Sequence, residues 1–223
     1  MNEALKLKKK YKTARDKLFN SLIINNDGFI FNNHHTKLVD DVVRDIVKNI
    51  IKEYSIDDFA LIAVGGYGRN DLSPKSDVDL LFLYKKSNKN IKNFITTLNN
   101  NLWDVGLEVG ISFLTLKQVI IDSKKDIKTV TKFAESRHLI GDEDYYGEFV
   151  RSIKILIGRL NPLKLSEKKL LELVERHDYY LGIKSNLEPQ IKEGIGGLRD
   201  IHTIIWVSIF MFNVLKLEDL IQI

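Results

Sequence analysis

The segment AVGGYGRNDLSPKSDVDLLFLY, residues 63–84, constrains the fold more than any other part of the chain. A short apolar run ends at Gly65 and Gly66, and a stretch rich in Gly, Asn, Ser and Pro follows. A second apolar run then begins with Asp77-Val78-Asp79. The two runs predict buried strands, and the stretch between them predicts a loop with room for one helical turn. The chain is therefore expected to contain a small sheet that carries two carboxylates.

Asp77 and Asp79 are two residues apart on a predicted strand, so their side chains project from one face, about 6.6 Å apart along the backbone. Two carboxylates at that distance repel by about 2.5 kcal/mol at an effective dielectric near 20. A divalent cation between them reverses the sign, and Mg²⁺ takes one or two carboxylates and completes its shell with water and phosphate oxygens. A D-x-D pair alone is more often solvated. Behind a strand and paired glycines it favours a site for Mg²⁺, or Mn²⁺, at Asp77 and Asp79.

The glycine loop has the composition of a phosphate-binding loop. Without side chains, Gly65 and Gly66 allow backbone amides to approach a triphosphate, and a helical turn after them would point its N-terminus at the anion. The guanidinium of Arg69 offers a planar donor fork to phosphate oxygens. Ser76 adds a hydroxyl. The sequence thus predicts that these four residues bind the phosphates of a nucleoside triphosphate.

The order of strand, Gly-Gly, loop and D-h-D-h resembles the signature of polymerase-β-type nucleotidyltransferases. The resemblance implies an α/β (α+β) fold with a mixed sheet, helices on one side of it, and a metal-dependent nucleotidyltransferase activity. It also implies a third carboxylate from a later strand, as a base or a metal ligand. The predicted strand at 106–115 offers Glu108, and Asp104 lies just before it. Glu108 is the preferred candidate, and Asp104 is the alternative.

Longer matches narrow the resemblance to the bacterial PII uridylyltransferase/uridylyl-removing enzymes. The resemblance implies transfer of UMP from UTP to a tyrosine of a PII-type nitrogen regulatory protein, with release of pyrophosphate. Such family members also carry an HD phosphohydrolase domain and ACT domains, and we expect neither in this sequence. The matching segments are GGYGRNDLSPKSDVDLLFL, LWDVGLEVG at 102–110, ESRHLIGD at 135–142 and NLEPQIKEGIGGLRDIHTIIW at 186–206.

The last of these segments has two interpretations. From the resemblance, Lys192 and Arg199 are predicted to bind the nucleotide, together with Glu193 and Asp200. The same four residues could instead form ion pairs that hold the helical segment against the catalytic domain. Buried Lys/Glu and Arg/Asp pairs are an ordinary way to join two units, which favours the second interpretation.

One departure from the family pattern leaves other functions open. After the predicted third strand's glycine, the family commonly continues His-Ser-x-Arg-Thr, whereas here Ile111 and Phe113 flank Ser112. This puts in doubt the substrate contacts of the missing histidine and arginine. The alternatives are a protein adenylyltransferase of the glutamine-synthetase-modifying type and a non-catalytic nucleotide-binding regulator.

The rest of the chain reads as helices around the sheet. We expect N-terminal helices in residues 1–57, the catalytic domain in 58–141 and a helical segment in 142–223 that carries the KEGIGGLRD motif. Thr36 is the expected N-cap of a helix that ends at Tyr54. Trp103 and Trp206 are expected in the core. The remaining predicted helices span residues 1–22, 88–103, 116–140, 143–160, 166–182 and 198–215.

Composition excludes some classes of function. The absence of cysteine rules out disulfides and thiolate metal sites and fits a cytoplasmic protein. The longest apolar run, Ile204 to Phe212, is too short for a membrane span and predicts a buried helix. The 34 basic and 30 acidic side chains leave a net charge of only +4, which does not favour a nucleic-acid partner.

Overall fold

The computed structural model describes residues 3–86, 89–182, 190–215 and 219. The chain divides into two compact units. The first comprises residues 1–121 and 135–150, and the second comprises residues 122–134 and 151–223.

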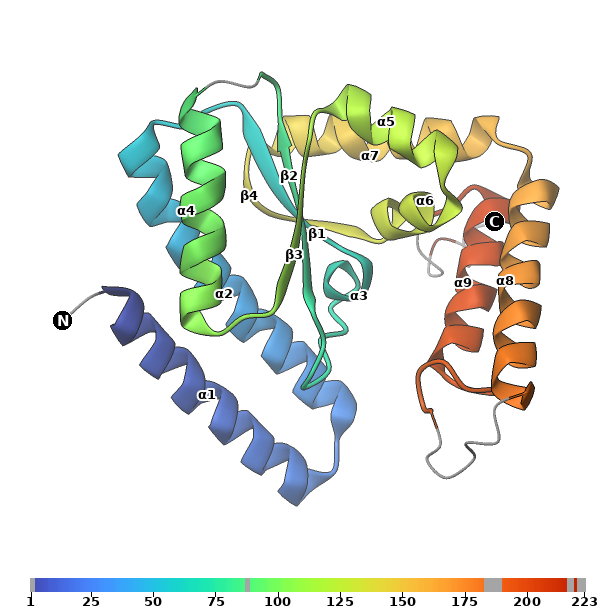
Figure 1. Ribbon diagram of the computed structural model, residues 1–223, viewed down its shortest axis with the longest axis horizontal. Helices are drawn as coiled ribbons and strands as arrows, with labels where there is room; N and C mark the ends of the chain where they lie inside the picture. The colour runs from blue at the N-terminus through green and yellow to red at the C-terminus, as the bar shows by residue number, and fades with distance from the viewer. Residues whose placement is uncertain (1–2, 87–88, 183–189, 216–218, 220–223) are drawn as a thin grey trace. The chain divides into compact units, whose positions relative to one another are not determined.

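The first unit is built on a mixed sheet, as predicted, and the sheet has four strands (Figure 1). The strand order is β3-β2-β1-β4. β2 runs parallel to β3, and β1 runs antiparallel to both β2 and β4. The strands are β1 (Phe59–Val64), β2 (Val78–Tyr84), β3 (Val109–Leu114) and β4 (Ser136–Gly141).

The fourth strand corrects the prediction of one helix over residues 116–140. Those residues form α5 (Leu116–Lys125) and α6 (Ile127–Ala134), and the chain then enters β4. β4 pairs with β1, with Ala60 opposite Gly141 and Ile62 opposite His138. Pairing with a strand about 75 residues earlier outweighs the local pattern here, because strand propensity depends strongly on tertiary context.

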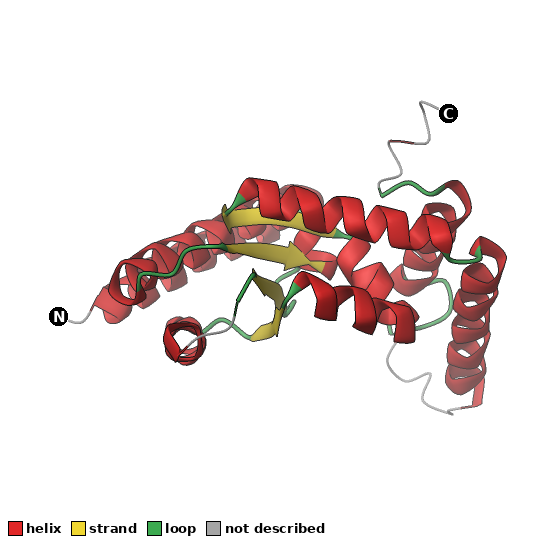
Figure 2. Ribbon diagram, turned by 90° about the horizontal axis from the view of Figure 1, so that it is seen from above, coloured by secondary structure: helices red, strands yellow, loops and turns green. Residues whose placement is uncertain are grey.

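Helices cover one face of this sheet (Figures 1 and 2). They are α2 (Gly28–Tyr54) and α4 (Lys89–Val105), and α1 (Glu3–Asn25) packs against both of them. α2 begins eight residues before the predicted N-cap: Asp27 caps the helix by accepting a hydrogen bond from Ile30 N at 2.9 Å. The prediction for Thr36 is therefore wrong, and Thr36 is buried inside the helix.

The core of the first unit lies between the sheet and these helices. Alternate strand residues point toward them, and Phe82 lies 5.0 Å from the rings of both Phe59 and Phe94. Trp103, predicted in the core, is 63% exposed, and its neighbour Leu102 is fully buried. The helical period places Leu102 on the buried face of α4 and Trp103 on the other.

A single helical turn, α3 (Gly65–Gly68), follows β1. A Cβ on Gly68 would lie 2.2 Å from the carbonyl oxygen of Glu135, because the turn packs directly on the start of β4. Gly68→Ala is therefore expected to lower the free energy of unfolding by about 1–3 kcal/mol, measured by chemical denaturation. Gly28→Ala is the control, since a Cβ there would meet nothing within 4 Å. An equal loss in both variants would contradict the packing account.

The second unit contains α6, the end of α7 (Glu143–Arg159), α8 (Pro162–Gly182) and α9 (Leu198–Phe212). α8 and α9 pack against each other. Trp206 is buried as predicted, with Lys169 Nζ 4.5 Å from its ring centre. α9 is not buried on all sides, since Ile204 is 67% exposed, which corrects that prediction. Among the described helices, none combines the length and apolar character that a membrane crossing requires.

Candidate functional site

The glycine turn and the carboxylate pair meet at one end of the sheet. Because β1 and β2 are antiparallel, with Ala63 opposite Leu80, the end of β1 lies beside the start of β2. α3 follows directly, and Gly65 adopts a φ of 60°, a left-handed conformation that favours glycine. Asp77 immediately precedes β2, and Asp79 is the second residue in it.

Glu108 reaches the same end of the sheet from the neighbouring strand. Val78 pairs with Val109 in the parallel ladder, and Val78 N donates to the carbonyl oxygen of Glu108 at 2.8 Å. Successive side chains of a strand alternate between the two faces of the sheet. The side chain of Glu108, one residue before Val109, is therefore on the same face as those of Asp77 and Asp79, on either side of Val78. Asp104 lies in the last turn of α4, where it is exposed.

The carboxylate of Asp79 has room because its partner on the neighbouring strand, Gly110, has no side chain. A Cβ on Gly110 would lie 3.1 Å from Asp79 Oδ1, closer than ordinary van der Waals contact. The donors at this end are hard carboxylate oxygens, which suit Mg²⁺ or Mn²⁺. Within the described residues, no three His, Asp or Glu side chains lie close enough to hold a metal ion. The fit is therefore to an ion held by two carboxylates, with phosphate and water supplying its other ligands.

The other predicted phosphate ligands make contacts within the protein. Arg69 forms an ion pair with Glu135, whose side chain is 4% exposed, and lies 4.0 Å from Asp71. Ser76 Oγ accepts a hydrogen bond from Ser73 N at 3.1 Å. A Cβ on Gly66 would make only ordinary contacts at 3.7 Å. Arg69 is thus already oriented at the glycine turn, but a phosphate would have to share it with Glu135.

A buried ionic network, which the sequence reasoning missed, holds the glycine turn in place. Asp40 of α2 accepts hydrogen bonds from Tyr67 Oη at 2.7 Å and from Arg137 of β4 at 2.6 and 3.0 Å. Burial raises the pKa of Tyr67 well above its usual range, and the Asp40 carboxylate raises it further, so the phenol remains a donor. The sequence did contain a sign of this network: Asp40 is an acid that lies among the apolar residues Val39 and Val43 of the predicted helix.

The loop between α3 and β2 is also fastened to α2. Asn32 Nδ2 donates to Asp71 at 2.7 Å, and the ring of His35 hydrogen-bonds to the carbonyl oxygen of Leu72 at 3.1 Å. Burial lowers the pKa of His35, so its ring favours the neutral form. Leu72 itself is fully buried. These contacts fasten the loop to α2 at Asp71 and Leu72, a few residues before the carboxylates.

The glycine-rich motif of the second unit stabilises its own helices. Asp200 forms an ion pair with Arg176 of α8 and a hydrogen bond with the His177 ring at 3.0 Å, and it accepts a hydrogen bond from Gly196 N at 2.8 Å. Burial alone would raise the pKa of Asp200, but the hydrogen bonds from His177 and Gly196 N and the charge of Arg176 together lower it. These contacts join α8 to the motif at the start of α9.

The other motif residues do not converge on one point. Arg199 Nη2 donates to Glu193 at 2.9 Å, and its guanidinium lies 5.5 Å from the Trp206 ring centre. Lys192 is exposed, and its carbonyl oxygen accepts a hydrogen bond from Arg199 N. Residues 186–189 of the predicted motif lie outside the described residues. The contacts of Glu193, Arg199 and Asp200 thus lie within the second unit.

Two known protein families match this chain, one in its N-terminal part and one in its C-terminal part. The family described as "Nucleotidyltransferase domain" matches residues 43–142, and the family described as "GlnD PII-uridylyltransferase" matches residues 164–223. The bifunctional uridylyltransferase/uridylyl-removing enzyme of Chromobacterium violaceum is 40% identical over 154 residues, 67% of this chain and 17% of that protein. The protein of the same description from Nitrosospira multiformis is 32% identical over 209 residues, 91% of this chain and 23% of that protein.

The chain spans about a fifth of the length of these relatives. A solved toxin–antitoxin complex with AMP-PNP superposes with a TM-score of 0.37 and 14% identity over 59% of this chain. That similarity is too distant to inform the site.

Proposed function

We propose that this chain transfers UMP from UTP to a tyrosine of a PII-type protein. The premise is its membership of the PII-uridylyltransferase family, which rests on the nucleotidyltransferase match at residues 43–142 and the PII-uridylyltransferase match at residues 164–223. The observation that carries the proposal is the meeting of the glycine turn with Asp77 and Asp79 at one end of the sheet. A nucleotide bound there would place its triphosphate between backbone amides and carboxylate-held cations, the arrangement that phosphoryl transfer requires.

The reaction is a single displacement at phosphorus. The tyrosine hydroxyl attacks the α-phosphate of UTP, an O–P bond forms to UMP, the bond to the β-phosphate breaks, and pyrophosphate leaves. Bound Mg²⁺ supplies charge neutralisation on the phosphates. Asp77 and Asp79 would hold the ion, the amides after Gly65 would bind phosphate oxygens, and Glu108 would accept the hydroxyl proton. Catalysis then rests mainly on positioning and electrostatic stabilisation.

One observation keeps a second function in view. Ser112 pairs with Leu81 in the ladder and lies between Ile111 and Phe113, without the histidine and arginine of the family pattern. A non-catalytic nucleotide-binding regulator would retain the carboxylates and the glycine turn and lose the contacts to the acceptor. A protein adenylyltransferase would share the same carboxylates and differ in its choice of base.

The test uses the chain with a PII protein, Mg²⁺ and either UTP or ATP labelled at the α-phosphate. We expect label on the PII protein with UTP, and none when EDTA removes the metal or the acceptor tyrosine is replaced by phenylalanine. Label from ATP alone would indicate an adenylyltransferase. Saturable UTP binding in calorimetry without any transfer would support the regulator and overturn the proposal.

Gly110 gives a prediction about metal binding. Gly110→Ala would displace the Asp79 carboxylate by a few tenths of an ångström, and we expect transfer to fall by about 10–100-fold. The loss should shrink at higher Mg²⁺ concentration, because the added methyl group perturbs a metal ligand and leaves the nucleotide turn in place. A Mg²⁺ titration of the rate, with thermal melting as the control for folding, measures this. A loss that Mg²⁺ leaves unchanged would contradict the assigned role of Asp79.

A further inference from the structure

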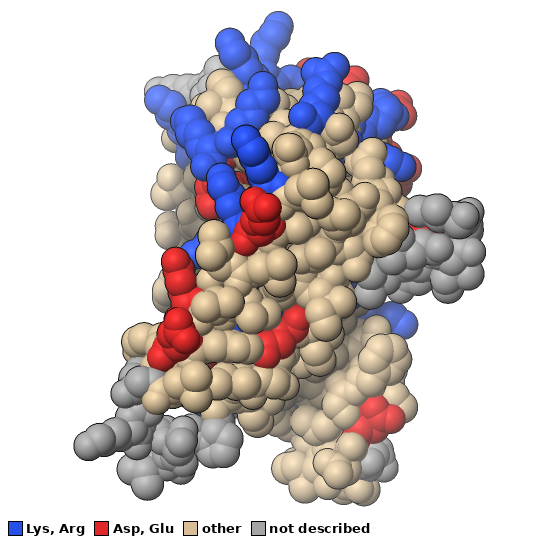
Figure 3. Space-filling model, turned by 90° about the vertical axis from the view of Figure 1, so that its right-hand side faces the viewer, with Lys and Arg blue, Asp and Glu red and all other residues tan. Residues whose placement is uncertain are grey.

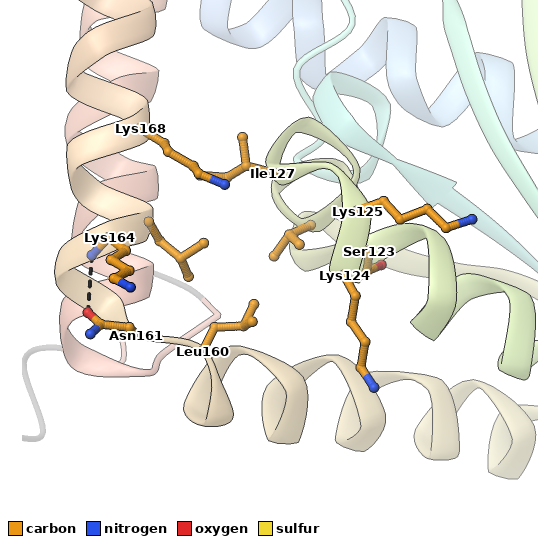
Figure 4. Close-up of a pocket in the computed structure, with 10 residues that line it drawn as sticks. Ser123, Lys124, Lys125, Ile127, Leu160, Asn161, Lys164 and Lys168 are labelled. Carbon is orange, nitrogen blue, oxygen red and sulfur yellow. Dashed lines mark hydrogen bonds between the residues drawn. The ribbon is translucent and has the colours of Figure 1, made fainter.

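The second unit contains a cavity of about 180 Å³ at the junction of α5 and α6 with the start of α8 (Figure 4). A single water needs about 10–15 Å³ of such volume, so the cavity has room for a small molecule. All of the lining residues belong to the second unit. The cavity therefore shares no residue with the carboxylate site. Its apolar lining consists of Ile127, Val130, Leu160 and Leu165.

Lysines dominate the polar part of the lining: Lys124, Lys125, Lys164 and Lys168. Lys125 lies 3.6 Å from Asp122 and points away from the cavity, whereas Lys168 extends from α8 toward Ile127 (Figure 4). In the described part of the chain, no acid lies within ion-pair distance of the other three. Figure 3 shows Lys and Arg side chains gathered toward one end of the face that it views. Lys124, Lys164 and Lys168 are exposed, and their positive charges attract an anion to the rim of the cavity.

A second feature of the lining points to a ligand independently of the lysines. Ser123 is 2% exposed, and its Oγ has no hydrogen-bond partner among the described residues. Buried hydroxyl groups nearly always have a partner, so this one requires an explanation. The hydroxyl can donate to an anionic oxygen. The first turn of α8 is already capped, since Asn161 Oδ1 accepts from Lys164 N at 3.1 Å, so the ligand contacts here are side-chain contacts.

We propose that this cavity binds a small organic anion. Its charged oxygens contact Lys164, Lys168 and Ser123, and its apolar body lies on the lining formed by Ile127, Val130, Leu160 and Leu165. An inorganic anion would leave the apolar lining uncovered, and a neutral alcohol would leave the lysines unpaired. The two halves of the cavity thus call for one molecule with both properties. The proposal does not depend on catalysis at Asp77 and Asp79.

Calorimetric titration with butyl phosphate, inorganic phosphate and 1-butanol separates the contribution of the anionic group from that of the apolar chain. EDTA is present throughout, so that the carboxylate site holds no metal. We expect saturable binding of butyl phosphate, weaker binding of phosphate and none of butanol. Lys164→Ala with Lys168→Ala should weaken butyl phosphate binding by about tenfold or more, and Ser123→Ala should weaken it by a smaller factor.

The matched control removes two exposed lysines of the first unit, Lys17 and Lys48, and should leave the affinity unchanged. Circular dichroism confirms that each variant is folded. The absence of saturable binding to the wild type would overturn the proposal. Equal affinity of the Lys164/Lys168 variant would do so too, and so would an equal loss in the control, which would indicate attraction by net charge alone. Transfer of UMP, assayed separately, reports on the proposed function.

Discussion

Asp77→Asn and Asp79→Asn are each expected to lower the rate of UMP transfer by about a thousandfold or more. Asparagine keeps the size of the side chain but removes the negative charge that, in the proposed mechanism, would hold a divalent cation on the triphosphate. Because Asp77 is exposed and Asp79 is partly buried at the end of a strand, the fold should survive both changes. Steady-state transfer from labelled UTP measures the rate. Thermal melting should show equal or greater stability, since the change relieves repulsion between the two acids.

Matched carboxylate variants test the third position. Glu108→Gln is expected to reduce transfer strongly, because the ladder register places Glu108 on the face of Asp77 and Asp79. Asp104→Asn, at the exposed end of α4, is expected to leave the rate close to that of the wild type. The opposite ranking would assign the third carboxylate to Asp104. Wild-type turnover in either the Asp77 or the Asp79 variant would show that the catalytic site lies elsewhere.

Asp40→Ala is expected to lower the free energy of unfolding by about 3–5 kcal/mol and the melting temperature by roughly 10 °C. The change leaves the guanidinium of Arg137 and the hydroxyl of Tyr67 without the buried carboxylate that they share. Thermal melting followed by circular dichroism measures the effect. Asp41→Asn is the matched control: Asp41 is the next residue of the same helix, and its side chain is 76% exposed.

Tyr67→Phe separates the two partners of Asp40. It removes one hydrogen bond and keeps the ion pair with Arg137, so we expect a loss of about 1–2 kcal/mol, smaller than that of Asp40→Ala. If Asp40→Ala were no more harmful than Asp41→Asn, the network would not be what fixes the glycine turn. A melting temperature reduced equally by Tyr67→Phe and Asp40→Ala would instead assign the main contribution to the phenol.

Local pattern was sufficient for the parts of the fold that depend on nearby residues. The apolar runs before Gly65 and after Asp77 are strands, since each is long enough to be buried and is bounded by turn residues. The sequence did not show that the helix is capped by Asp27 and not by Thr36, because a polar stretch lies between them. His35, part of that stretch, is buried only because the loop containing Leu72 packs on it. The exposure of Trp103 likewise follows from a one-residue difference in helical phase.

Long-range partners account for what the sequence did not reveal. The local sequence pattern predicts a helix through residue 140, and the strand forms there because β1 is available to pair with it. The importance of Asp40 emerges only when Tyr67 and Arg137, which are 27 and 97 residues away along the chain, reach the same carboxylate. For the candidate site, the spacing of the glycine and carboxylate motifs predicted which residues lie at one end of the sheet. It did not predict that Arg69 would be paired with Glu135.

The late position of β4 in the chain has a consequence for biogenesis. β1 and β2 can pair as soon as residue 84 has emerged from the ribosome, because only the glycine loop separates them. The opposite edge of β1 must wait for residues 136–141, and pairings over such long separations form slowly. Until then the nascent chain exposes an unpaired apolar strand edge beside the glycine turn, and such an edge is prone to aggregate or to bind a chaperone.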